Sequence, residues 1–170
     1  ENVELKAKIT KMAEAVLDKD AVFGSNTSTL PITGLAEASE RPENFIGIHF
    51  FSPVERMGLV EIISGEKTSE ATLAKAVDYV LAIRKTPIAV NDSRGFYTSR
   101  CFGTYTREGM EMLAEGIKPA IIENVGRQSG MPMGPLEVSD SVGLDTALKV
   151  TRATAEAAGI DLQTDDRTQF

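Results

Sequence analysis

The 170-residue sequence has few of the residues that build metal centres and disulfide frameworks. It contains one histidine, His49, and one cysteine, Cys101. A single cysteine cannot form an internal disulfide, which is typical of a reducing compartment. One histidine and one cysteine far apart in the sequence also lack the spacing of a metal site. We therefore expect no internal disulfide and no bound metal, and Cys101 is most simply a small residue in the core.

Segments that would assign a function directly are also missing. The longest apolar runs are far shorter than the roughly 18 residues of a membrane span. The formal net charge is -7, and the sequence has no basic stripe of the kind that contacts nucleic-acid phosphates. No Gly-x-Gly-x-x-Gly occurs, so a phosphate-binding loop of that type is lacking. The sequence thus predicts neither a membrane span nor a nucleic-acid partner.

What the sequence does contain is the composition of a globular protein, with 42% hydrophobic residues, and a change of pattern near residue 93. Before that point, helical periodicity alternates with short apolar runs, which predict helices over 3–17 and 69–84 and strands over 21–25, 45–51, 59–63 and 86–91. Beyond it we find no convincing strand, and helices are predicted to end at Gly116, Gly130 and Gly159. The pattern therefore indicates an α/β part followed by an all-α part.

Residues 45–63 hold the single histidine in one apolar run and a single carboxylate in the next. Turn-forming residues separate the two runs, so we predict a hairpin. If its centre is near Glu55, residues whose numbers add to 110 face each other, and His49 lies opposite Glu61. A histidine oriented by a carboxylate can act as a general base. It can equally be a core residue whose hydrogen bonds the carboxylate satisfies, and the pattern leaves both interpretations open.

Two further polar segments stand where ligands often bind. Asn26–Thr29 follows the predicted strand 21–25 directly, and open α/β sheets bind ligands at such strand ends. The same residue types also cap helices, and a short helix is predicted after Pro31. Ser99 opens the first helix after the change of pattern, where a hydroxyl could reach a small molecule between domains. Gly95 is equally well explained as a hinge.

Five groups of residues carry a resemblance to a known family: Ser25–Ser28, Gly47–Val54, Leu59–Ile63, Lys85–Pro87 with Gly95–Phe96, and Pro132–Pro135 with Val142–Asp145. Taken together, they resemble the L-3-hydroxyacyl-CoA dehydrogenases of fatty-acid β-oxidation. They occur in the order and spacing of that family, and the resemblance covers residues 1 to about 150. The segment Ser-Pro-Val-Glu-Arg-Met, which begins at Ser52, is most similar to the dehydrogenase part of multifunctional β-oxidation α subunits.

The resemblance implies a fold and a reaction. Residues 1–92 are expected to be the C-terminal part of an NAD-binding Rossmann domain, and residues 93–170 the start of a helical C-terminal domain. Members of the family oxidise the 3-hydroxyl group of an acyl-CoA with NAD. By the resemblance, His49 takes the hydroxyl proton as general base and Glu61 orients it. Ser28 contacts the substrate oxygen, and Ser99 stands at a catalytic position where the family usually has asparagine.

The resemblance also implies the cofactor contacts. Glu1 and Lys6 match positions near the nicotinamide end of NAD, and Ser28 and Ser52 are expected to bind the cofactor as well. Ser52 stands where many members have asparagine. The chain begins neither with methionine nor with a signal peptide, and the family's glycine-rich loop lies before the position of Glu1. We therefore expect a fragment of a longer enzyme that binds NAD weakly and is inactive alone.

Two other interpretations remain. The related β-hydroxyacid dehydrogenases use a lysine in the helical domain, which the paired His49 and Glu61 disfavour. A catalytically impaired module of the same fold, which serves as a structural or subunit-contact piece, is the second. For the dehydrogenase, the expected partners are an acyl-CoA substrate and either a second copy or a thiolase subunit of a β-oxidation complex. The expected location is the cytoplasm, or the mitochondrial matrix or peroxisome in a eukaryote.

Overall fold

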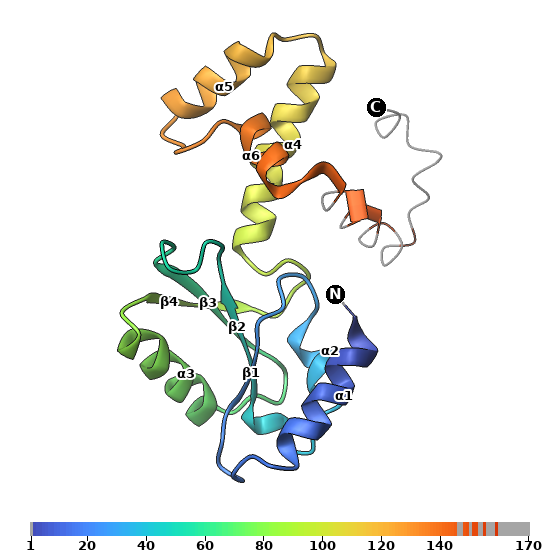
Figure 1. Ribbon diagram of the computed structural model, residues 1–170, viewed down its shortest axis with the longest axis vertical. Coiled ribbons are helices and arrows are strands. Elements are labelled where there is room, and N and C mark those ends of the chain that lie inside the picture. The colour runs from blue at the N-terminus through green and yellow to red at the C-terminus, as the bar shows by residue number, and fades with distance from the viewer. Residues whose placement is uncertain (1, 146–147, 150, 153–154, 156–158, 160–170) are drawn as a thin grey trace. The chain divides into compact units, whose positions relative to one another are not determined.

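The computed structural model in Figure 1 describes residues 2–145, 148–149, 151–152, 155 and 159. The chain folds as two units, Glu1–Arg100 and Cys101–Phe170. The first contains all the strands of the described chain, and the second is helical, which confirms the predicted α/β part followed by an all-α part. The domain boundary predicted between residues 92 and 93 stays a prediction.

Helices and short strands alternate in the first unit. Its helices are α1 (Val3–Glu14), α2 (Ile32–Ala36), a 3₁₀ turn η1 (Pro42–Asn44), α3 (Glu70–Ala82) and the beginning of α4 (Thr98–Ala114). Its strands are β1 (Phe23–Ser25), β2 (Phe45–Phe50), β3 (Leu59–Ser64) and β4 (Thr86–Asn91). They form one sheet in the order β1-β2-β3-β4. The pairs β1–β2 and β3–β4 are parallel, and β2–β3 is antiparallel.

The β2–β3 hairpin has the register that the sequence predicts. His49 lies opposite Glu61, and Ile48 lies opposite Ile62. A slip of one residue would move the apolar side chains of a strand to its other face. The same slip would turn His49 and Glu61 to opposite faces, so the register decides that these two polar residues meet, and this prediction is confirmed.

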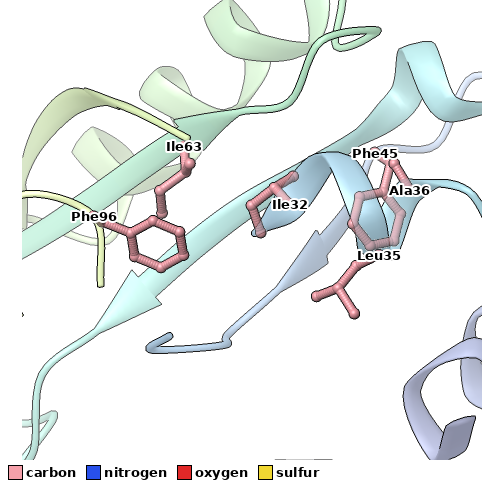
Figure 2. Packing of buried hydrophobic residues seen from close by; sticks show 6 residues of the cluster. All are labelled: Ile32, Leu35, Ala36, Phe45, Ile63 and Phe96. Carbon is pink, nitrogen blue, oxygen red and sulfur yellow. The ribbon is translucent and has the colours of Figure 1, made fainter. Parts of the chain in front are cut away.

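The sheet is covered on both faces, with α3 on one side and α2 on the other (Figure 1). Side chains alternate between the faces along each strand. On the α3 face, Ile46, Val60 and Ile62 of the strands form a buried cluster with Ala76 and Val80 of the helix. On the α2 face, Ile32, Leu35 and Ala36 of the helix form a second buried cluster with Phe45, Ile63 and Phe96 (Figure 2). His49 lies four positions after Phe45 on β2, and Glu61 lies two positions before Ile63 on β3, so the polar pair points to the α2 face.

A carboxylate from the end of β4 holds the beginning of α2. Asp92 Oδ1 accepts a hydrogen bond from the Ile32 N–H at 2.7 Å, and Oδ2 accepts one from the Thr33 N–H at 2.8 Å. The first amides of a helix have no partner within the helix, and a negative charge there is favourable. The residue types of Asn26–Thr29 suit a cap for this helix, but the side chain that binds its first two amides comes from a residue 60 positions away.

The second unit contains α4, α5 (Pro119–Gln128) and α6 (Pro135–Val142). The first two were predicted. Helix α6 was not, because its proline-rich start is typical of a rigid connector. Its cap is again distant in sequence: Glu123 Oε1 accepts hydrogen bonds from the N–H groups of Leu136 at 2.8 Å and Glu137 at 3.2 Å. Cys101 is exposed, so the expectation that it fills the core is wrong. The last helix predicted to end at Gly159 falls largely outside the described residues.

The close approach of α2 to β2 can be tested at Gly47. A β-carbon at this position would lie 2.7 Å from Ile32 Cδ1 and 3.0 Å from Ile63 Cβ. Both isoleucines are fully buried and have no room to move away. We expect Gly47→Ala to lower the denaturant midpoint of the protein by the equivalent of about 1–3 kcal/mol, as overpacking does.

Gly34→Ala is the matched control, because Gly34 lies in α2 and a β-carbon added there would meet nothing within 4 Å. Alanine is the better helix former, so we expect this midpoint to be unchanged or slightly raised. Equal midpoints for both variants would contradict the packing of α2 described above.

Candidate active site

The centre of the site is a hydrogen bond between two side chains that are both withdrawn from solvent. His49 Nδ1 and Glu61 Oε2 are 2.7 Å apart. Glu61 is 0% exposed and His49 is 6% exposed. Burying an ionisable group is costly unless it is paired and hydrogen-bonded. The antiparallel register places the two residues directly opposite each other, so the pair forms without a distortion of the strands.

The second oxygen of Glu61 is held by the main chain. Glu61 Oε1 accepts hydrogen bonds from the N–H groups of Tyr97 at 3.1 Å and Thr98 at 2.8 Å. Thr98 is the first residue of α4. The carboxylate therefore occupies the N-terminus of a helix, where unpaired amides and the helix dipole favour a negative charge.

These contacts determine the charge of Glu61. Burial by itself would raise the pKa of the carboxyl, but hydrogen bonds from His49 and from the two backbone amides outweigh it and hold that pKa below its ordinary value. The Thr98 hydroxyl also lowers this pKa, although within the described chain its oxygen completes no hydrogen bond. An ionised carboxylate only accepts hydrogen bonds, so the proton of a neutral His49 lies on Nδ1 and Nε2 keeps a lone pair.

Two aromatic rings lie beside the imidazole. The centroid of the Phe51 ring is 4.6 Å from that of His49, and the centroid of Phe96 is 5.9 Å away. Both rings are tilted against the imidazole. Such contacts limit the rotation of the histidine side chain and exclude water from one side of it. The His49 imidazole is thus oriented by the Glu61 carboxylate and by packing against two aromatic rings at the same time.

The loop after β1 is tied to the strand that carries His49. Asn26 Oδ1 accepts a hydrogen bond from the Phe50 N–H at 2.9 Å. Thr27 is fully buried, and its hydroxyl oxygen accepts from the Leu30 N–H at 3.0 Å. Ser28, in the same loop, is half-buried. The loop that carries this predicted substrate and cofactor contact is therefore fixed to β2 next to the histidine.

The other residues singled out in the sequence lie on separate elements. Ser99 is exposed in the first turn of α4, next to the residue whose amide binds Glu61. Ser52 is exposed in the loop after β2. Lys6 is half-buried in α1, and Glu1 lies outside the described residues. The structure brings His49 and Glu61 together, and the roles expected for all of these residues stay predictions.

Sequence reasoning missed several contributors to this site. The amides of Tyr97 and Thr98 gave no signal, because every residue except proline carries such a group. Asn26 was noted only as part of a polar cluster. Phe96 belongs to one of the segments that carry the resemblance, and that match was the only available indication of its position beside His49.

The described residues fit part of a dinucleotide site. The hydroxyl-rich loop 26–29 directly follows the carboxyl end of β1, which pairs in parallel with β2, and open α/β sheets bind nucleotides at such ends. Among all the residues that the structure describes, no three histidine, cysteine or acidic side chains lie close enough together to hold a metal ion. Nor does any helix of the described ranges have the length and apolar composition to cross a membrane. The fold and the site define a dinucleotide-binding α/β domain with a buried histidine–carboxylate pair.

Comparison with known proteins agrees with this class. Residues 1–93 match the family model of the 3-hydroxyacyl-CoA dehydrogenase NAD binding domain, and residues 95–167 match that of the C-terminal domain of the same enzymes. The chain therefore belongs to the 3-hydroxyacyl-CoA dehydrogenase family.

Individual relatives show the same relationship. The chain is 41% identical to the fatty acid oxidation complex subunit alpha of Shewanella loihica over 98% of its own length and 25% of that protein. A crystal structure of (S)-3-hydroxybutyryl-CoA dehydrogenase from Ralstonia eutropha matches with a TM-score of 0.88 at 35% identity, over 99% of this chain and 59% of that one. The 3-hydroxybutyryl-CoA dehydrogenase from Escherichia coli matches with a TM-score of 0.87 at 31% identity, over 95% and 34%. The chain thus spans a quarter of the length of the curated relative.

The charge of Glu61 makes the stability of the protein depend on pH. Since its folded pKa lies below its unfolded value, its ionisation stabilises the fold above the ordinary carboxyl range, and this contribution is lost as pH falls through the folded pKa. We expect the wild-type midpoint of urea denaturation to fall from about pH 5 downward. Glu61→Gln should be less stable at neutral pH and lose less stability on acidification.

Glu55→Gln is the control, because Glu55 is an exposed glutamate in the loop after β2. Its curve of midpoint against pH should follow the wild-type curve. Parallel curves for wild type and Glu61→Gln would show that Glu61 is not held as a stabilising carboxylate.

Proposed function

We propose that the protein containing this chain oxidises the 3-hydroxyl group of L-3-hydroxyacyl-CoA to a 3-oxo group with NAD, in the oxidation of fatty acids. The observation that supports this most strongly is the buried His49–Glu61 pair, with its 2.7 Å hydrogen bond on the α2 face of the sheet. Membership of the 3-hydroxyacyl-CoA dehydrogenase family and the names of the relatives point to the same reaction.

In this proposal the chemistry of the chain is a proton transfer. NAD, when bound, supplies the acceptor for the hydride that leaves C3 of the substrate. His49 accepts the hydroxyl proton on Nε2, the nitrogen that Glu61 leaves with a lone pair. The imidazole then becomes a cation, and the ionised carboxylate of Glu61 stabilises that cation through Nδ1. In the reverse direction His49 returns the proton to the oxygen.

The remaining predicted residues complete the proposal. Ser28 and Ser99 hydrogen-bond the reacting oxygen, and Ser28, Ser52, Lys6 and Glu1 contact the cofactor. The fixed loop after β1 supports this role for Ser28, since Asn26 holds the loop on the strand of the histidine. Residues 1–92 then form the C-terminal part of the NAD-binding domain, and residues 93–170 belong to the helical domain.

The name of one relative supports a proposal about partners. This relative is called the alpha subunit of a fatty acid oxidation complex. We accordingly propose that the protein works in the cytoplasm, as a homodimer or together with a thiolase subunit that consumes the 3-oxoacyl-CoA product.

The proposal is tested by replacing the histidine. We expect His49→Gln to lower the NADH-dependent reduction of acetoacetyl-CoA by the full-length protein about 10²- to 10⁴-fold, because the proton donor is lost. Thermal denaturation checks that the variant is folded, and fluorescence titration with NADH checks that the cofactor still binds.

The results distinguish the proposed mechanism from its alternatives. A variant that keeps activity within a few-fold of wild type would exclude His49 as the acid–base group. A folded wild-type protein that binds NADH without turnover would favour the alternative of a catalytically impaired module.

A further inference from the structure

Phe96 has a backbone conformation that phenylalanine rarely adopts. Its φ is 48°, and the preceding Gly95 has a φ of 76°. For glycine a positive φ costs little, but a bulky side chain in this region is strained and is retained only where the surrounding structure enforces it. The chain thus keeps an unfavourable conformation at Phe96, in the segment that connects β4 to α4.

Two contacts enforce this turn. The Phe96 N–H donates to the Ser93 carbonyl oxygen at 2.8 Å, which closes a four-residue turn with Gly95 at its third position, where positive φ is common. The Phe96 side chain is only 2% exposed and belongs to the core on the α2 face. Figure 2 shows its ring beside Ile63 and Ile32. Burial of the ring therefore anchors the strained turn.

The residues that directly follow the turn bind the His49–Glu61 pair. The next two residues, Tyr97 and Thr98, are the ones whose amides bind Glu61 Oε1. The Phe96 ring also lies 5.9 Å from the imidazole of His49, centroid to centroid. One residue thus acts on both members of the pair: its backbone directs two amides to the carboxylate, and its ring packs beside the histidine.

We propose that Phe96 is a positioning residue of the dehydrogenase reaction, whose buried ring holds the left-handed turn that presents the amides of Tyr97 and Thr98 to Glu61. Its catalytic consequence rests on the function proposed above. Loss of the ring releases the turn, the amides leave the carboxylate, and the carboxylate no longer holds His49 in register. Misplacement of a catalytic group by about 1 Å is enough to slow a reaction up to about 100-fold.

The simpler explanation is that Phe96 only fills the core, and Phe45 provides the matched control. It is 1% exposed and belongs to the same buried cluster. Its ring stacks on Phe23 at 5.4 Å. The substitution to leucine therefore removes the same atoms from the same core at both positions, and it changes a contact of the His49–Glu61 pair only at Phe96.

The test compares Phe96→Leu and Phe45→Leu in the full-length protein. We expect both to lower the melting temperature by similar amounts. Phe96→Leu should lower kcat for acetoacetyl-CoA reduction roughly 10- to 100-fold with little change in the KM for NADH. Phe45→Leu should leave kcat within about 3-fold of wild type, the range expected of a substitution outside the site. Equal effects of the two variants on kcat would overturn the proposal.

A double-mutant cycle tests the route through Glu61. If Phe96 acts on the carboxylate, Phe96→Leu should have little further effect on kcat in a Glu61→Gln background. Multiplicative effects of the two substitutions would contradict that route. Should Phe96→Leu fail to fold, Phe96→Met keeps more of the buried volume and replaces it in the cycle.

A readout without turnover separates this inference from the proposed function. The acid-side loss of stability that Glu61 causes should flatten in Phe96→Leu and persist in Phe45→Leu. An inactive wild-type protein with this difference would refute the dehydrogenase proposal but retain the positioning of Glu61 by Phe96. An active wild type with equal pH profiles for both variants would refute the positioning alone.

Discussion

The structure of the first unit depends on one constraint, the need to satisfy a carboxylate buried in the middle of a sheet. Glu61 is fully withdrawn from solvent, and its two oxygens are both occupied. The antiparallel register supplies His49 to one oxygen, and the beginning of α4 supplies two amides to the other. The charge that results decides which nitrogen of the histidine carries the proton. The fold and the proposed chemistry therefore follow from the same set of hydrogen bonds.

Carboxylates at helix N-termini recur in the described chain. Asp92 binds the first amides of α2, Glu61 binds those at the start of α4, and Glu123 binds those of α6. In each case the acid comes from a different element, so it joins two parts of the fold while it satisfies amides that have no partner in the helix. Two of these carboxylates hold elements that lie next to the site. Asp92 holds the beginning of α2, and Glu61 holds the beginning of α4, the helix that carries Ser99.

The sequence predicts the local and periodic features of this structure well. Two apolar runs, each with a single ionisable residue, and a turn centred near Glu55 were sufficient to place His49 opposite Glu61. The distant caps could not be predicted, because any Asp or Glu could serve and only the folded chain selects Asp92 or Glu123. Helix α6 was missed because its proline-rich start is typical of a rigid connector, and its cap, Glu123, lies on another helix. The turn at Phe96 escaped prediction because nothing in its side chain indicates a positive φ.

The central claim is that an ionised Glu61 fixes the tautomer of His49. It is tested most directly by ¹⁵N NMR of the protein labelled at histidine, with the His49 signals assigned by their loss in His49→Gln. At a pH where the imidazole is neutral, the account predicts a proton on Nδ1 and none on Nε2, and a mixture of tautomers in Glu61→Gln. A wild-type spectrum in which Nε2 carries the proton would contradict the account.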